Sequence, residues 1–506
     1  MRTLPDLLAR IEARGGSPFL GAAGTVLSGA EFAARARALA RGMQAAGVVP
    51  GQRVAIYLEK RVEKALAVFA AALAGAISVV VNQKLKDAQL QQIVGDCTPG
   101  LCVTSQAKLA LLEDPAALRA SVRLLDVDQP LPAAAALPGP WPPLAPADPA
   151  TLLYTSGSTG PPKGIIQSHG SLHDGARIVA GYLGLTPKDH LLGILPLSFD
   201  YGLNQVLGAA YAGSRITLLQ YFALPEVFAA LAALPATGLA GVPVFWSAFA
   251  SALRTGQADP GTLHALRYVT NSGGRLAVAD IQTLRAHLPW VAVFSMYGLT
   301  EAFRSAYLPP ELIDTRPLSI GRAVPEVELL VVDPATGREC DSGEVGELVH
   351  TGALLADGYW NRPADTAAVF RPDPRDPRKR AVWSGDLGRR DADGLLYFVG
   401  RRDRQLKVSG YRVSPDEVEQ HLRTVGGVGL AAVFGVPDAV AGHRLVACVV
   451  PGPDAPGDLA AAVARSCRRT LPHFLVPAEI HVVVSPPLNA NGKIDVPALA
   501  RALGHA

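Results

Sequence analysis

Patterns typical of buried strands alternate with helical patterns along most of this chain, and that alternation limits the folds open to it. The apolar, β-branched stretch RVAIYLE is followed by the helical pattern KALAVFAAALAGA and then by ISVVVN. Further on, GLCVT precedes AKLALLEDPAALRA. Strands separated by helices in this way pair in parallel, and the helices cover the faces of the sheet. The pattern predicts layered α/β structure with a mostly parallel sheet.

The character of the sequence changes several times towards the C-terminus. Gln129–Pro149 is rich in proline and alanine, which is typical of a surface connector. From about Ile320, short strand patterns with turn signals, such as GEVGELVHTG, predict a β-rich subdomain. After Asp403 strands and helices alternate again, in a compact α+β unit of roughly 100 residues. A length of 506 residues therefore leaves room for three or more structural units.

The composition excludes several classes of protein. A net charge of +3 over 506 residues gives no electrostatic reason to expect a nucleic-acid or membrane-surface partner. The five cysteines include no CxxC pair and are typical of reduced thiols. The N-terminus lacks the apolar core of a signal peptide. The uncharged run Ala65–Val81 divides at Gly75 into a helical half and a β-branched half, which argues against a membrane span. We therefore expect a cytoplasmic protein.

A loop rich in glycine, serine and threonine follows the apolar strand pattern TLLY. It runs Tyr154-Thr-Ser-Gly-Ser-Thr-Gly-Pro-Pro-Lys-Gly164. Its glycines permit tight turns, its hydroxyl and N–H groups can surround anionic oxygens, and Lys163 adds a positive charge. It does not fit the GxxxxGK[ST] pattern of the P-loop NTPases. The segment predicts a phosphate-binding loop, with a flexible surface turn as the alternative.

Two further motifs carry groups suited to nucleotide chemistry. Met296-Tyr-Gly-Leu-Thr-Glu-Ala302 places a tyrosine that could stack on a purine beside Thr300 and Glu301, which could hold a hard cation. Asn491-Gly-Lys493-Ile-Asp495 is a turn that presents a lysine. Taken alone, the first is explained equally well by a capped helix start, and the second means little.

Another pair of segments presents groups for a sugar. Trp383-Ser-Gly-Asp-Leu-Gly places the carboxylate of Asp386 where it could accept hydrogen bonds from a ribose diol. Gly400-Arg-Arg-Asp follows, and Arg401 could reach the same sugar or a phosphate. A charged β-hairpin is the structural alternative.

In their order and spacing along the chain, these four motifs resemble the core motifs of the adenylate-forming superfamily. That superfamily includes acyl-CoA synthetases, non-ribosomal-peptide adenylation domains and luciferases. The resemblance covers essentially the whole chain. It implies a large N-terminal AMP-binding domain over residues 1–402, with layered α/β sheets and a β-rich subdomain. It further implies a hinge at Asp403 and a small, mobile α+β lid domain over residues 403–506. ATP and Mg²⁺ are the implied cofactors.

The resemblance also implies roles for individual residues. Lys493, the adenylation lysine, would form the catalytic set with Glu301 and Thr300, and Glu301 would bind Mg²⁺. The nucleotide would be held by Thr155, Ser156, Gly157, Ser158, Thr159, Gly160, Lys163, Ser272, Gly273, Gly274, Tyr297, Asp386 and Arg401. Rotation about Asp403 would withdraw Lys493 and bring Lys407, Ser409, Gly410 and Tyr411 to the thiol-transfer step.

The acid to be activated is suggested by Leu197-Ser-Phe-Asp-Tyr-Gly-Leu-Asn204. Many fatty and aryl acyl-CoA ligases carry an FHxYG-like stretch here, whereas Phe199-Asp200 resembles the FD of amino-acid adenylation domains, whose aspartate pairs with the substrate ammonium. A carboxylate beside an apolar pocket is costly unless it is paired. Alternatively, Asp200 could pair with a neighbouring arginine or cap a helix. The substrate pocket is expected to include Phe199, Asp200, Val242, Phe245, Trp246, Ser272 and Gly298.

Other features point towards a different branch of the family. YGLTE has leucine where peptide-synthetase domains usually have proline, and the motifs are most similar to stand-alone acyl-CoA ligases found beside exosortase A systems. We predict activation of an acid, first of all an amino acid, to an acyl-adenylate with release of pyrophosphate. Transfer to the pantetheine thiol of a separate carrier protein would follow.

Several alternatives stay open at this point. The principal one is an AMP-forming acyl-CoA ligase that joins a non-amino fatty or aryl acid to coenzyme A. Transfer of the acyl group to an amine is a further possibility. A protein that binds nucleotide without turnover is disfavoured because Lys493, Glu301 and the loop are all present.

Two patterns receive structural interpretations. His169 and His173 have helical spacing but no third ligand nearby in the sequence, which favours the N-terminal region of a helix over a metal site. Gly427-Val-Gly429 mimics a dinucleotide fingerprint but lacks the acidic residue and the βαβ context that the fingerprint requires. We expect a turn that leads into a strand there.

Overall fold

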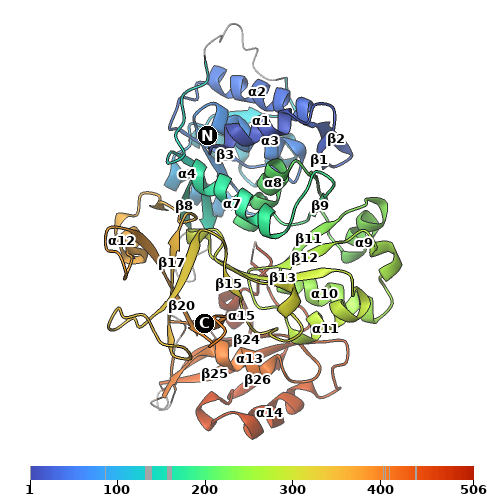
Figure 1. Cartoon of the computed structure of the whole chain (residues 1–506), viewed down its shortest axis with the longest axis vertical. Coiled ribbons are helices and arrows are strands. Elements are labelled where there is room, and N and C mark those ends of the chain that lie inside the picture. The colour runs from blue at the N-terminus through green and yellow to red at the C-terminus, as the bar shows by residue number, and fades with distance from the viewer. Residues whose placement is uncertain are drawn as a thin grey trace.

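The computed structural model describes residues 2–85, 87–130, 140–155, 162–402, 404, 406–408, 411–438, 442–489 and 491–505. For Lys407, Tyr411, Arg412 and Gly442 it describes the backbone alone. A large N-terminal domain and a smaller C-terminal domain follow one another along the longest axis (Figure 1). This confirms the predicted mixed α/β fold with two unequal domains. Asp403 lies outside the described residues, so the hinge and the boundary at 402/403 stay predictions.

One sheet of the N-terminal domain has seven strands among the described residues. Their order is β18 (Gly358–Tyr359), β8 (Lys163–Ser168), β7 (Pro149–Thr155), β4 (Ile77–Val80), β3 (Arg53–Ile56), β5 (Leu101–Thr104) and β6 (Leu124–Asp126). The strands from β7 to β6 run parallel, while β8 and β18 extend one edge antiparallel. The mostly parallel sheet predicted from the strand and helix alternation is confirmed here.

The second large sheet has nine strands in the part of the chain that the structure describes. Their order is β15 (Arg322–Ala323), β14 (Ala306–Leu308), β13 (Ala292–Tyr297), β12 (Tyr268–Asn271), β11 (Gly238–Gly241), β9 (His190–Gly193), β10 (Arg215–Leu218), β1 (Pro18–Ala22) and β2 (Thr25–Ser28). The strands from β13 to β1 are parallel, so the residues that follow β11, β12 and β13 all lie along the edge that the carboxyl ends of the strands form. Ligands of parallel α/β sheets commonly bind at that edge.

The predicted β-rich subdomain is also confirmed. Its antiparallel strands are β16 (Val327–Val332), β17 (Val345–Gly352), β20 (Arg380–Arg390) and β19 (Phe370–Pro372), in that order. Strand β19 pairs with the first residues of β20, and β21 (Leu396–Arg401) pairs with its last residues. This sheet carries both predicted sugar-binding residues, and Asp386 on β20 lies opposite Arg401 on β21.

A layer of helices shares one hydrophobic core with both large sheets. The helices of the N-terminal domain are α1 (Leu4–Glu12), α2 (Gly29–Ala45), α3 (Val62–Leu73), α4 (Asp87–Cys97), α5 (Gln106–Leu109), α6 (Pro115–Ser121), α7 (His169–Tyr182), α8 (Asp200–Ala212), α9 (Leu224–Ala233), α10 (Pro243–Arg254), α11 (Val278–His287) and α12 (Pro363–Val369), with short 3₁₀ turns η1 (Pro260–Leu263), η2 (Thr300–Ala302) and η3 (Pro310–Leu312). Phe32 of α2 packs edge-on against Phe19 of β1 and Phe69 of α3, at centroid distances of 5.0 and 5.5 Å. The same cluster includes Ile56 of the seven-stranded sheet.

The C-terminal domain is a small α+β unit. Its strands are β22 (Leu406–Val408), β23 (Tyr411–Val413), β24 (Val428–Asp438), β25 (Gly442–Pro451) and β26 (Glu479–Val482), and its helices are α13 (Pro415–Leu422), α14 (Leu459–Thr470) and α15 (Val496–Ala502), with the turn η4 (His473–Leu475). Strands β23, β22, β25 and β24 pair in that order, and β26 joins β25. A separate apolar cluster that includes Val418, Val433 and Val463 forms the centre of this domain.

The structure confirms the structural interpretations of three sequence patterns: the His169/His173 pair, the glycines at 427 and 429, and the uncharged run Ala65–Val81. Helix α7 begins at His169, with the side chain of Ser168 as its N-cap. Gly427 lies in the turn that leads into β24, and Gly429 is the second residue of that strand. The run Ala65–Val81 divides into α3 and β4. Among the described residues, none of the helices is both long and apolar enough to cross a bilayer.

Helix α3 buries Lys64, and within the described ranges no carboxylate lies at hydrogen-bond distance from its Nζ. Lys64 is 1% exposed, and its Nζ donates to the carbonyl oxygens of Leu58 at 2.7 Å and Val81 at 3.1 Å. A neutral amine has two N–H donors, so these two acceptors satisfy the uncharged form. Burial lowers the pKa of Lys64 from 10.5 to about 7.

This lysine makes stability depend on pH. Between pH 7 and 10.5 the unfolded chain holds a proton on Lys64 that the folded chain has lost, so the free energy of unfolding rises with pH across that window. We predict that Lys64→Met flattens this rise, by up to about 1.4 kcal/mol per pH unit. Urea unfolding at pH 7.5 and pH 9.5 measures it, with the exposed Lys188→Met as control. Equal rises in the wild type and in both variants would refute the assignment.

Candidate functional site

The hairpin β7–β8 fixes both ends of the predicted phosphate loop. Thr155 and Lys163 lie opposite each other in the antiparallel register. The predicted loop residues between them, Ser156, Gly157, Ser158, Thr159 and Gly160, lie outside the described residues. Lys163 forms an ion pair with Asp365 of α12 at 3.0 Å, and its Nζ is 5.2 Å from the centroid of the Tyr359 ring. The lysine is thus held at the base of the loop.

The predicted Mg²⁺ ligand lies against the same hairpin. The hydroxyl of Tyr359 on β18 donates to Glu301 Oε1 at 2.7 Å, and the amide of Gln167 on β8 donates to the carbonyl oxygen of Thr300 at 2.6 Å. Burial, reinforced by the Glu301 carboxylate, raises the pKa of Tyr359, which keeps its hydroxyl protonated as a donor. The loop base and the Thr300–Glu301 pair therefore occupy one region. Glu301 offers a hard carboxylate oxygen, the ligand type that suits Mg²⁺.

Two separate motifs meet at Asp386. Its Oδ2 accepts a hydrogen bond of 2.6 Å from the hydroxyl of Tyr297, and its Oδ1 lies 2.9 Å from Nη1 of Arg401. The carboxylate is 6% exposed, and burial raises the pKa of Asp386 while Arg401 opposes the increase. The Tyr297 ring lies near those of His350 and Phe398, at centroid distances of 5.8 and 6.3 Å. Residues from β13, β20 and β21 are thus joined by hydrogen bonds.

The C-terminal domain contributes Lys493 to this region. Gly273 follows β12 with φ +83°, and a Cβ added to it would lie 3.1 Å from Cε of Lys493. Desolvation lowers the pKa of Lys493, while the carboxylates of Asp200 and Asp386 oppose the change. The lysine is nevertheless still reached by solvent. The predicted adenylation lysine and the Ser272–Gly274 turn are therefore in contact across the two domains.

Asp200 is already paired in the structure. It is the first residue of α8, and its Oδ1 accepts a hydrogen bond from the backbone N–H of Tyr201 at 2.8 Å. Its Oδ2 lies 3.1 Å from Nη1 of Arg304, and both side chains are 3% exposed. This arrangement is the arginine pairing that the sequence left open as the alternative. The assignment of Asp200 to a substrate ammonium stays a prediction.

An unusual backbone conformation at Phe303 orients the next residue, Arg304, towards α8. The preceding Phe303 has φ +52°, a left-handed value that costs free energy in a residue with a Cβ. Its buried ring occupies the space beside Gly175 of α7, where an added Cβ would lie 2.3 Å from the ring. Packing of Phe303 therefore fixes the turn that directs Arg304 towards α8.

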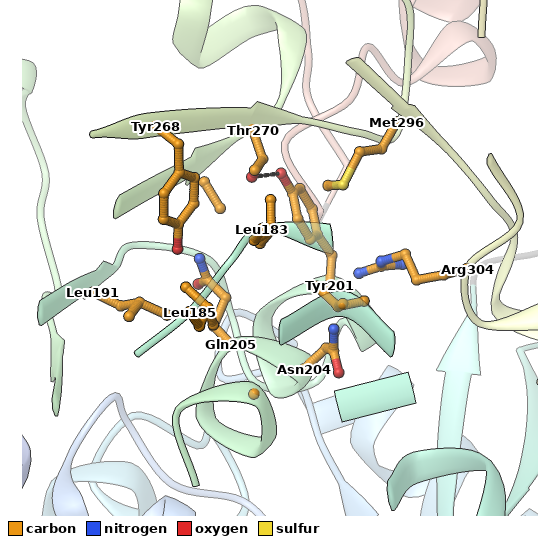
Figure 2. Close-up of a pocket in the computed structure, with 13 residues that line it drawn as sticks. Leu183, Leu185, Leu191, Tyr201, Asn204, Gln205, Tyr268, Thr270, Met296 and Arg304 are labelled. Atoms are coloured by element: carbon orange, nitrogen blue, oxygen red, sulfur yellow. Dashed lines mark hydrogen bonds between the residues drawn. The ribbon is translucent and has the colours of Figure 1, made fainter. Parts of the chain in front are cut away.

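A small pocket of about 30 Å³ lies beside this ion pair, between α7, α8 and the strands of the nine-stranded sheet (Figure 2). Its polar lining residues include Tyr201, Asn204, Thr270 and Arg304. The hydroxyls of Tyr201 and Thr270 bond each other at 2.5 Å. None of the expected substrate-pocket residues lines this pocket: Phe199, Asp200, Val242, Phe245, Trp246, Ser272 and Gly298.

The expected wall residues lie around the pocket instead. Trp246 is fully buried and donates to the carbonyl oxygen of Thr270 at 3.0 Å. Val242 lies beside Gly273 and Gly492, hence near Lys493. Two of the lining residues could have been found from the sequence, because Tyr201 and Asn204 follow Asp200 at helical spacings of one and four. No sequence pattern marked Arg304.

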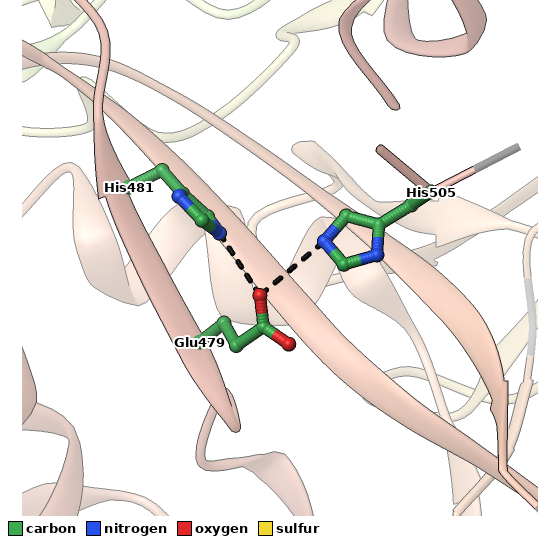
Figure 3. Close-up of side chains that lie close together, drawn as sticks. All are labelled: Glu479, His481 and His505. Carbon is green, nitrogen blue, oxygen red and sulfur yellow. Dashed lines mark hydrogen bonds and ion pairs between the residues drawn. The ribbon is translucent and has the colours of Figure 1, made fainter. Parts of the chain in front are cut away.

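The C-terminal domain holds a second polar cluster (Figure 3). His481 donates to Glu479 Oε2 at 3.0 Å, His505 Nε2 lies 3.3 Å from the same oxygen, and Arg444 pairs with the other carboxylate oxygen. Arg444, followed by His481, lowers the pKa of Glu479 to about 2. Since a guanidinium already neutralises this carboxylate, the cluster is explained as an ion-pair network that fastens the end of the chain to β26.

Known proteins resemble this chain over nearly all of its length. It is 32% identical to novobiocin biosynthesis protein H of Streptomyces niveus, covering 97% of this chain and 81% of that protein. It is 30% identical to the L-proline--[L-prolyl-carrier protein] ligase of Streptomyces coelicolor, covering 92% and 90%. Some relatives are much longer, and the chain spans 7% of tyrocidine synthase 3 of Brevibacillus parabrevis.

Solved structures agree with the fold. ATP-bound MatB from Rhodopseudomonas palustris matches with a TM-score of 0.87 at 28% identity, over 99% of both chains. The apo form of that protein matches with a TM-score of 0.77 at 29% identity, again over 99% of both chains. The o-succinylbenzoate CoA synthetase of Bacillus subtilis with its acyl-adenylate intermediate matches at 0.84 and 26% identity, over 100% of this chain and 98% of that one.

Two family models account for most of the sequence. Residues 8–360 match the AMP-binding enzyme family, and residues 417–493 match the AMP-binding enzyme C-terminal domain. The two matches follow the chain in the order of the two domains. Together with the converging motifs, they establish that this chain belongs to the AMP-binding enzymes, the adenylate-forming superfamily of AMP-forming ligases.

Proposed function

We propose that this enzyme activates a carboxylic acid without an α-amino group, using ATP and Mg²⁺, and passes the acyl group from the adenylate to a pantetheine thiol. The observation that carries the adenylation step is the position of Lys493. This lysine comes from the C-terminal domain, yet it contacts Gly273 and interacts electrostatically with Asp200 and Asp386. The ammonium is thus presented at the edge of the sheet where the ATP motifs converge.

The chemistry needs positive charge at this place. A carboxylate is a weak nucleophile that the phosphates of ATP repel, so the barrier is largely electrostatic and positional. Lys493 would stabilise negative charge that develops between the acid and the α-phosphate. Lys163 and the loop amides would hold the departing phosphates, and Asp386 with Arg401 would hold the ribose. Mg²⁺ on Glu301 would neutralise phosphate charge.

The arrangement of the domains supports this step. The whole chain matches ATP-bound MatB better than apo MatB, with TM-scores of 0.87 and 0.77. Since both comparisons cover 99% of this chain, we infer that the domains here are arranged as for adenylate formation. Presentation of Lys407–Tyr411 for thiol transfer would then require a second arrangement.

The ion pair of Asp200 favours an acid without an α-amino group. A substrate ammonium could replace Arg304 only by leaving a buried guanidinium unpaired, and breaking such a pair costs about 3–5 kcal/mol. An amino acid is the second candidate, because the relative from Streptomyces coelicolor is a prolyl-carrier protein ligase.

We propose a pantetheine thiol as the acceptor, because this group is common to carrier proteins and coenzyme A. A carrier protein and coenzyme A present the same pantetheine arm, and the similar proteins include both a carrier-protein ligase and a CoA synthetase. We expect an acceptor that acts as a separate molecule. Thioester formation with purified coenzyme A and with a phosphopantetheinylated carrier distinguishes the two sources.

A substitution of Lys493 is expected to affect adenylate formation and to leave thioester formation intact. We predict that Lys493→Ala abolishes carboxylate-dependent ATP–pyrophosphate exchange, because the ammonium that stabilises the developing charge is lost. Thioester formation from a synthetic acyl-adenylate should be retained. An equal loss in both assays would contradict the assignment of two separate arrangements.

Contact between Gly273 and Lys493 can be tested separately. Gly273→Ala places a Cβ 3.1 Å from Lys493 Cε at a φ of +83°, whereas Gly256→Ala introduces a Cβ at a φ of +71° with no atom within 4 Å. Both variants bear similar backbone strain, of about 1 kcal/mol. We predict that ATP–pyrophosphate exchange falls at least several-fold in Gly273→Ala alone. Equal exchange rates in the two variants would mean that this contact does not matter.

A panel of acids tests the substrate class. We predict that fatty or aryl acids support ATP–pyrophosphate exchange and that amino acids do not, because Asp200 is occupied by Arg304. The ratio of kcat/KM values for matched pairs, such as butyrate and 2-aminobutyrate, provides the measurement. Exchange confined to amino acids would overturn the proposed class and favour loading of an aminoacyl carrier.

A further inference from the structure

Two imidazoles of the C-terminal domain converge on a single carboxylate oxygen (Figure 3). Oε2 of Glu479 lies 3.0 Å from Nε2 of His481 and 3.3 Å from Nε2 of His505. One ligand atom from each of the three residues lies within 4.8 Å of the other two. Carboxylate and imidazole ligands hold Zn²⁺ at about 2.0–2.2 Å, and tetrahedral angles then separate neighbouring ligand atoms by roughly 3.4 Å. The observed distances are therefore close to those around a bound cation.

The imidazole of His505 has an unsatisfied nitrogen. Its side chain is 13% exposed, and its Nε2 is buried and has no hydrogen-bond partner among the described residues, although it lies at ion-pair distance from Glu479. More than nine in ten buried polar groups have a partner, and a buried group without one is destabilising. A cation bonded to the lone pair of this nitrogen would satisfy it.

Arg444 orients the carboxylate for such a role. Its guanidinium pairs with Oε1 of Glu479, which leaves Oε2 facing both imidazoles. Carboxylates that bind a metal are commonly supported by a hydrogen bond of this kind. Glu479 and His481 are 34% and 33% exposed, so water can complete the coordination and hydrate the added charge. Without a cation, the same contacts form the ion-pair network that fastens the chain end to β26.

The two imidazoles decide the class of cation. Imidazole nitrogen suits Zn²⁺, Ni²⁺ and Cu²⁺, whereas Mg²⁺ and Ca²⁺ prefer sites made of oxygen ligands. Coordination uses the Nε2 lone pairs, so both rings would carry their proton on Nδ1 in the bound form. Two histidines and one carboxylate, with a fourth position open to water, are a ligand set that Zn²⁺ adopts in proteins. This chemistry differs from that of the Mg²⁺ position proposed at Glu301.

We propose that Glu479, His481 and His505 bind one Zn²⁺ or a similar divalent transition-metal ion. His481 lies on β26, before the segment that carries Lys493, and His505 lies after that segment. The bound ion therefore closes a loop around this segment and α15, and it holds the end of the chain on the sheet of the C-terminal domain. Because the unfolded chain does not bring the three ligands together, metal binding stabilises the folded protein.

Zn²⁺ binding to the full chain tests this site without relying on turnover. The protein is freed of metal with a chelator and titrated with Zn²⁺ in excess Mg²⁺, against a chromophoric competitor. We expect about one equivalent to bind per chain and to raise the thermal unfolding midpoint. Co²⁺ in place of Zn²⁺ should give the visible absorption of nitrogen and oxygen ligands without thiolate charge-transfer bands, which separates this site from the five cysteines. A lack of stoichiometric binding, or a thiolate spectrum, overturns the proposal.

Variants then identify the ligands. His481→Ala and His505→Ala each remove one ligand nitrogen, so Zn²⁺ affinity should fall at least about 10-fold and the Zn²⁺-dependent rise in the unfolding midpoint should disappear. His264→Ala removes an exposed histidine of the N-terminal domain and should bind as the wild type does. Midpoints measured in chelator show whether each variant folds, and the Co²⁺ spectrum of the wild type tests the ligand set if one does not. Equal affinity in all three variants overturns the assignment.

Discussion

The buried ion pair between Asp200 and Arg304 connects the start of α8 with the segment that follows β13. Asp200 begins α8, and Arg304 follows the segment that carries Tyr297 and Glu301. Removing either partner would leave a charge in a region with almost no solvent, at a cost of about 3–5 kcal/mol. The pair therefore fixes the start of α8 relative to the end of β13. It also occupies the carboxylate of Asp200, which the sequence had suggested as the partner of a substrate ammonium.

Around this pair, contacts between distant segments assemble the nucleotide region. Tyr297 and Arg401 share Asp386, while Tyr359 links Glu301 to the strand that follows the phosphate loop. Tyr297 and Glu301 lie at and after the end of β13, and residues from the antiparallel strands β18, β20 and β21 meet them there. The C-terminal domain brings Lys493 next to Gly273, and under the proposed function adenylation depends on this arrangement of the two domains.

Much of the fold could be predicted because local patterns specify it. Alternating strands and helices gave the parallel sheets, and short strands with turns gave the β-rich subdomain. The partner of Asp200 could not be found in this way, because Arg304 lies 104 residues away in the sequence and is aimed by the positive φ of Phe303. The residues that line the pocket could not be predicted either, because Tyr268, Thr270 and Met296 are brought together only by the pairing of β12 with β13. Sequence motifs marked the chemistry shared by the family, whereas substrate recognition depends on tertiary contacts.

A crystal structure of the enzyme with a non-hydrolysable acyl-adenylate analogue would test the central claim most directly. The proposed function predicts an intact Asp200–Arg304 pair, Lys493 next to Gly273, and an acyl group without an α-amino group. An Arg304 side chain turned away, with Asp200 bound to an amino group of the ligand, would contradict it.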